Sequence, residues 1–98
     1  MSTPLRSTTV AIADSSALFR LGVRNMARQV KGIEILGEAS NAKDLVGMVQ
    51  SFAPQVVILD FLSDGFDIDA VRKVKVLAPK TRVLAITSEQ SGHTCLLY

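Results

Sequence analysis

The chain of 98 residues is 48% hydrophobic and only 20% charged, which excludes a disordered chain and leaves room for one domain. The formal net charge of +2 does not demand a polyanionic partner, because the eleven basic residues are dispersed. The single cysteine, Cys95, cannot form an internal disulfide. No apolar run approaches a membrane span, and the N-terminus carries no apolar signal segment, so we expect a cytoplasmic protein.

Short apolar runs alternate along the chain with stretches of helical periodicity. Residues 1–8 resemble a flexible polar tail, and residues 9–98 are predicted to form one domain. Strands are predicted at residues 10–13, 33–36, 56–59 and 82–86. Helices are predicted from Ser15 or Ser16 to Gly32, from about 42 to 52 after the cap Asn41, and from Asp67 to Pro79. Residues 88–91 indicate the approach to a fourth helix.

The first predicted helix has two distinct faces. Its apolar stripe, which we expect to face the core, consists of Leu18, Phe19, Gly22, Val23, Met26 and Val30. A basic stripe, consisting of Arg20, Arg24, Arg28 and Lys31, falls elsewhere on the helix. We expect this second face to be solvated, with a partner-docking surface as the alternative.

The order of the elements predicts the fold class. A β-α-β-α-β-α-β pattern with right-handed crossovers gives a doubly wound α/β fold, in which helices cover both faces of a parallel sheet. The run 56–59 is hydrophobic without interruption, as expected for a strand covered on both sides. Functional groups in such sheets gather at the carboxyl ends of the strands.

Three polar residues follow these apolar runs directly. Asp14 ends the first strand, Asp60 the third and Thr87 the fourth, so all three are predicted to lie at one rim of the sheet. Carboxylate oxygens with retained water suit Mg²⁺, and a carboxylate beside such a cation can attack phosphorus to form an aspartyl phosphate. A lone aspartate after a strand is more often a loop or cap residue. Asp64 and Asp67 are interpreted in that way, and His93 is assigned no role.

Four segments carry a family resemblance. The sequences IADSSALFRLGV, GEASN, PQVVILD and TRVLAITS resemble the receiver domain of bacterial two-component response regulators. The resemblance is greatest to receivers that precede a LuxR-type helix-turn-helix output, and it covers nearly all of residues 9–98. It implies a flavodoxin-like receiver fold and a signalling protein in transcription regulation rather than an enzyme.

The resemblance also implies roles for single residues. Asp60 would accept a phosphoryl group from a sensor histidine kinase, and Thr87 would be the switch hydroxyl. Mg²⁺ would be bound by Asp14, Asp60 and the backbone carbonyl of Leu62. Phosphorylation would switch a partner-binding surface, and DNA would be reached only through an output domain that is not present in this chain.

Several departures from the family pattern accompany the matches. Ser15 stands where the family has its second acidic residue, so the Mg²⁺ site is expected to be weak or absent. Asp64 replaces the usual proline; it could compensate for that loss or repel phosphate. The family's lysine would follow a fifth strand, which we expect to be absent together with the fifth helix, leaving a receiver fold of four strands.

Two consequences follow from these departures. An uncovered fourth strand would be an adhesive edge, so we expect a homodimer or higher oligomer joined through that strand and the broken fourth helix. The alternative function is a pseudo-receiver or a truncated receiver that acts as a phosphorylation-independent protein–protein interaction or dimerisation module. A small phosphatase with an aspartate nucleophile is disfavoured, because Leu62 stands where such enzymes usually carry a second aspartate.

Overall fold

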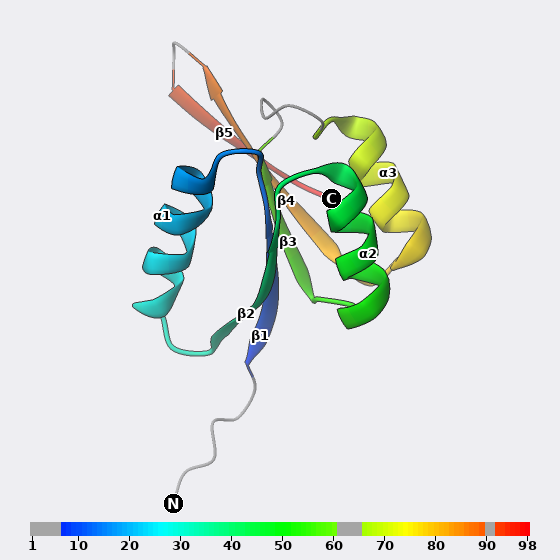
Figure 1. Cartoon of the computed structure of the whole chain (residues 1–98). Coiled ribbons are helices and arrows are strands. Elements are labelled where there is room, and N and C mark those ends of the chain that lie inside the picture. The colour runs from blue at the N-terminus through cyan, green and yellow to red at the C-terminus, as the bar shows by residue number, and fades with distance from the viewer. Residues whose placement is uncertain (1–6, 61–65, 90–91) are drawn as a thin grey trace, which may run out of the picture.

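Among the residues that the structure describes, one five-stranded sheet organises the fold, and helices lie on both of its faces (Figure 1). The computed structural model describes residues 7–60, 66–89 and 92–98. Its elements are β1 (Thr8–Ala13), α1 (Ala17–Arg28), β2 (Ile33–Ala39), α2 (Ala42–Phe52), β3 (Val56–Asp60), α3 (Ile68–Leu77), β4 (Arg82–Glu89) and β5 (Gly92–Leu97). The strand order is β2-β1-β3-β4-β5, and all neighbours are parallel except β4 and β5. The predicted α/β class and its doubly wound arrangement are confirmed.

The main hydrophobic core lies between the sheet and the helices α2 and α3. Alternate strand residues such as Ala11, Val57 and Val83 contribute to it from the sheet side. Leu45 and Val49 of α2 meet them from the helix side, each 1% exposed. The predicted starts of both helices are also confirmed, because the side chains of Asn41 and Asp67 accept hydrogen bonds from the first-turn amides.

The predicted orientation of α1 is wrong in part. Leu18, Met26 and Val30 were expected to face the core, yet they are 78%, 69% and 52% exposed. The half-buried residues of this helix are instead Phe19, Arg20, Val23, Arg24 and Ala27. The helix is rotated in this way because two arginines of the basic stripe turn towards a carboxylate on β2, as described below.

The predicted end of the fold is also wrong in one respect. The fourth strand does not stop at Thr87 before a helix; β4 continues to Glu89, and residues 92–97 return as the antiparallel strand β5. In the described part of the chain the sheet therefore has five strands rather than the expected four, and its fourth strand is not an open edge. An edge strand leaves a row of backbone N–H and C=O groups without partners, and pairing with β5 satisfies that row on β4.

Candidate functional site

Two aspartates follow the carboxyl ends of the neighbouring strands β1 and β3. Ala13 is the register partner of Leu59, so the residues that follow them, Asp14 and Asp60, are neighbours at the same rim. Asp14 is 2% exposed, whereas Asp60 is the half-buried last residue of β3. The predicted convergence of these two carboxylates is confirmed by the register of the sheet.

Asp14 is fixed in place by its main chain and its side chain. Its Oδ1 accepts a hydrogen bond of 2.6 Å from the backbone N–H of Ser16, and its own N–H donates to the carbonyl of Ala39 at 3.0 Å. The carbonyl of Asp14 accepts a bond of 2.6 Å from Nη1 of Arg20. Ser16, in turn, caps α1 through a bond from the N–H of Phe19. The rim carboxylate is therefore held by the first turn of α1.

A small ionic cluster joins α1 to β2 next to this rim. Nε of Arg20 and Nη1 of Arg24 donate to the two carboxylate oxygens of Glu38, at 3.2 and 2.5 Å. Arg20 and Glu38 are only 16% and 23% exposed at their side chains, so the cluster is partly shielded from water. The expectation that the whole basic stripe is solvated was therefore wrong for these two arginines. Two features of the sequence could have indicated this cluster: Arg20 and Arg24 are four residues apart, on one side of the helix, and Glu38 is the only charged residue in GEASN.

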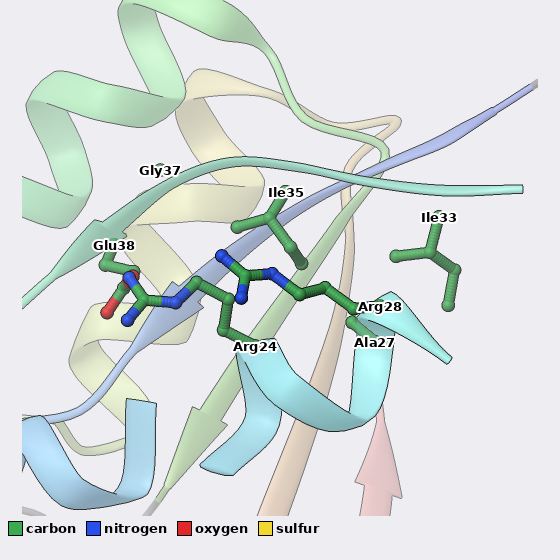
Figure 2. A pocket seen from close by; sticks show the side chains of 7 residues that line it. All are labelled: Arg24, Ala27, Arg28, Ile33, Ile35, Gly37 and Glu38. Atoms are coloured by element: carbon green, nitrogen blue, oxygen red, sulfur yellow. The ribbon is translucent and has the colours of Figure 1, made fainter. Parts of the chain in front are cut away.

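A separate cavity of about 380 Å³ lies between α1 and β2. Figure 2 shows Arg24 reaching towards Glu38, with the side chain of Arg28 lying along the cavity and Ile33 and Ile35 projecting from β2. The lining includes neither rim aspartate. This cavity is therefore distinct from the predicted site.

The remaining predicted site residues have different outcomes. Leu62 and Asp64 lie outside the described residues. The backbone of Thr87 lies one residue beyond Ile86, which is the register partner of Asp60. Thr87 was expected to end its strand, but it lies inside β4 and is the register partner of Thr94 in β5. The reason is again the hairpin, which extends β4 past the rim.

The donor set at the rim fits a hard divalent cation. Two carboxylates are the ligands that Mg²⁺ uses in proteins, together with retained waters. Within residues 7–60, 66–89 and 92–98 there is no cluster of three or more His, Cys, Asp or Glu side chains suited to a metal ion. Asp14 and Asp60 are the described carboxylates that follow the register partners Ala13 and Leu59 at this rim. In the same ranges, no helix has the length and apolarity needed to cross a membrane.

No family model matches the chain. Comparison with known proteins nevertheless finds relatives over most of its length. It is 30% identical over 79 residues to the response regulator UvrY of Escherichia coli (strain K12), covering 80% of this chain and 36% of that protein. It is 35% identical over 78 residues to a protein-glutamate methylesterase/protein-glutamine glutaminase of Alkalilimnicola ehrlichii, covering 79% of this chain and 20% of that protein. The chain thus spans about a third of the first relative and a fifth of the second.

A solved structure extends the likeness to the fold. The signal receiver domain of the putative response regulator NarL from Mycobacterium tuberculosis superposes with a TM-score of 0.78 at 26% identity. The match covers 87% of this chain and 69% of that one. The chain is therefore similar in sequence to response regulators, and its fold is similar to that of their receiver domains.

Proposed function

We propose that this chain is a signalling receiver that accepts a phosphoryl group on Asp60 from a sensor histidine kinase. The observation that carries the proposal is the pair of carboxylates at one rim, Asp60 half-buried at the end of β3 and Asp14 buried beside it. A carboxylate that accepts a phosphoryl group must be accessible to the phosphoryl donor, and Asp60 is partly exposed to solvent. Asp14 is the better shielded of the two and suits a supporting role.

The chemistry follows from these positions. A carboxylate oxygen of Asp60 attacks the phosphorus, the bond from phosphorus to the donor's imidazole nitrogen breaks, and that nitrogen keeps the electron pair. The product is a mixed anhydride on Asp60 with about one additional negative charge. Mg²⁺, bound by Asp14 and Asp60, would offset the charge on the transferred oxygens. Binding is expected to be weak, because Ser15 offers an exposed hydroxyl where a second acid would supply a carboxylate.

Phosphorylation would be transmitted through β4. Thr87 lies in the strand next to β3, one residue past the partner of Asp60, and so is close in register to the new phosphoryl group. A shift of Thr87 would alter the β4–β5 hairpin and with it the surface offered to partners. In a cytoplasmic, LuxR-type regulator of transcription, DNA would be contacted by an output domain outside these residues.

A second function is favoured by a specific observation. Ser15 removes one acidic side chain from the rim, and only Asp14 and Asp60 remain there among the described residues. A receiver with a weakened cation site could act as a phosphorylation-independent interaction module. Both functions use the same fold, so a chemical test separates them.

Intact-mass measurement after incubation with acetyl phosphate and Mg²⁺ is the direct test. We expect the gain of one phosphoryl group in the native chain and none in Asp60→Asn. Asp69→Asn is the matched control, because Asp69 is an exposed carboxylate at the start of α3. Absence of any gain in the native chain would favour the interaction module. A gain that persists in Asp60→Asn would place the phosphoacceptor elsewhere.

Self-association is the remaining part of the proposal. The fourth strand and a broken fourth helix cannot form the expected joint, since β5 already pairs with β4 and residues 88–89 belong to a strand. The edge strand on this side of the described sheet is β5, rather than β4 as had been predicted. The unphosphorylated chain already presents this edge, so association through it does not require phosphate at Asp60.

A further inference from the structure

The outer edge of β5 lacks the features that usually protect a sheet edge. Its sequence, Gly-His-Thr-Cys-Leu-Leu, contains no acidic residue, lysine, arginine or proline. The opposite edge, β2, carries Glu34 and Glu38 and has a register irregularity against β1 between Val10 and Ala11. Charges and irregularities of that kind discourage pairing with another chain. β5 is therefore the edge on which another strand could be added.

The hydrogen-bond pattern identifies which backbone groups of β5 point outward. Val83 and Tyr98 exchange both of their backbone hydrogen bonds, at 3.0 and 2.8 Å. In an antiparallel ladder such pairs alternate with pairs that make no bond to each other. Residues 94 and 96 of β5 thus bond inward to β4. His93, Cys95 and Leu97 direct their N–H and C=O groups to the free side, which no other strand occupies in the described part of the chain.

We propose that a second copy of this chain pairs antiparallel with β5, with Cys95 opposite the partner's Cys95 on a twofold axis. His93, Cys95 and Leu97 are spaced two residues apart. Antiparallel pairing centred on Cys95 therefore gives each of the three outward residues a hydrogen-bonding partner on the other strand. Cys95 exchanges two hydrogen bonds with its counterpart, and Leu97 exchanges two with the partner's His93. Antiparallel pairing of identical strands is self-complementary, as a closed twofold dimer requires.

The side chains next to the outer edge of β5 also favour pairing with a second copy of the chain. Cys95 is exposed and Leu97 is 60% exposed. Their register partners on β4, Ile86 and Leu84, are half-buried and lie on the same face of the sheet. Val83, which alternates with Leu84 along β4, belongs to the main core, so these side chains lie on the face opposite α2 and α3. Figure 1 shows α1 on that face, where its main contacts are with β1 and β2. Pairing would bring the two apolar patches together across the axis.

This inference rests on the self-association proposed above and specifies its geometry. Hydrogen-bonded antiparallel partners have Cα atoms about 5.5 Å apart and side chains on the same face of the sheet. A bismaleimide with a short spacer should therefore link two chains through Cys95, each thiol adding its sulfur and its hydrogen across one maleimide double bond. The matched control is Cys95→Ser with Ser51→Cys, which moves the thiol to an exposed position on α2.

We expect the native chain at about 50 μM to be dimeric by light scattering and to cross-link at least tenfold faster than the relocated thiol. Asp60→Asn should cross-link as fast as the native chain, which separates this result from that of phosphorylation. Leu97→Lys should be monomeric with an unchanged circular dichroism spectrum, because Leu97 is largely exposed. A native monomer would overturn the inference. A dimer that cross-links no faster than the control would overturn the β5 geometry and leave self-association standing.

Discussion

Helices α2 and α3 each bury three side chains against the sheet, whereas α1, all of whose residues are described, buries none. The α2–α3 face is stabilised by close packing of apolar groups such as Leu45 and Val74. On the other face, α1 has only half-buried side chains, and its arginines donate to Glu38 and to the carbonyl of Asp14. The two faces of one sheet therefore depend on different forces, and the polar attachment is the one that borders the rim aspartates.

The largest effect is expected from the packed face. Leu45→Ala removes a side chain that is 1% exposed and leaves a cavity beside Val49, so the free energy of unfolding should fall by about 2–5 kcal/mol. Urea denaturation followed by circular dichroism measures the change. Phe52→Ala, at a 58% exposed position of the same helix, is the control and should cost less than about 1 kcal/mol. Equal losses for the two variants would contradict a core centred on this face.

A smaller effect is expected from the polar attachment of α1. Glu38→Gln removes the charge that both Arg20 and Arg24 contact, and hydrogen bonds to charged groups contribute about 1.5–3 kcal/mol. Partial exposure reduces this figure, so we expect a loss of about 1–2 kcal/mol in the unfolding free energy. Asp69→Asn is the control, because its pair with Arg72 is about 70% exposed on both sides and should contribute less than about 0.5 kcal/mol. A control loss as large as that of Glu38→Gln would refute the role of shielding.

Capping should affect α1 and α2 alike. Ser16→Ala removes the acceptor for the N–H of Phe19, and Asn41→Ala removes the acceptor for the N–H of Asp44. Each should lower the unfolding free energy by about 1 kcal/mol. Thermal unfolding of the two variants in parallel checks this equality. If Ser16→Ala costs far more than Asn41→Ala, the cap of α1 has a further role in fixing Asp14.

The smallest effect is expected on the outer side of α1. Leu18 is 78% exposed, so Leu18→Ala should change the unfolding free energy by less than about 0.5 kcal/mol. The same denaturation measurement used for Leu45→Ala provides the comparison. A loss above 1 kcal/mol would show that Leu18 is covered in solution, contrary to its exposure in the single chain.

Local signals in the sequence were sufficient for much of this fold. The caps Asn41 and Asp67, the uninterrupted run at 56–59 and the alternation of elements predicted the helices, the central strand and the fold class. The rim pair Asp14 and Asp60 followed, since the ends of parallel strands share one edge. These features depend on short-range patterns that the rest of the molecule does not override.

The missed features depend on contacts between distant segments. Apolar spacing alone cannot reveal that Arg20 and Arg24 meet Glu38, because the pairing requires α1 to lie beside β2. Likewise, the choice between helix and strand after Thr87 was decided by the pairing groups of β4 rather than by local propensity. Tertiary hydrogen bonding outweighed the local signal in both places.

The antiparallel direction of β5 has a consequence for the order of folding. Glu89 and Gly92 are register partners only three residues apart in the sequence, whereas Val10 and Val56 of the central pair are separated by 46 residues. Hairpins form in about 1–10 μs, and closing long loops delays the pairing of distant strands. We expect β4–β5 amides to gain protection from hydrogen exchange before β1–β3 amides in pulse-labelled refolding. The last of the described strands would then be among the first to pair, so its outer edge would be exposed while the central strands are still unpaired.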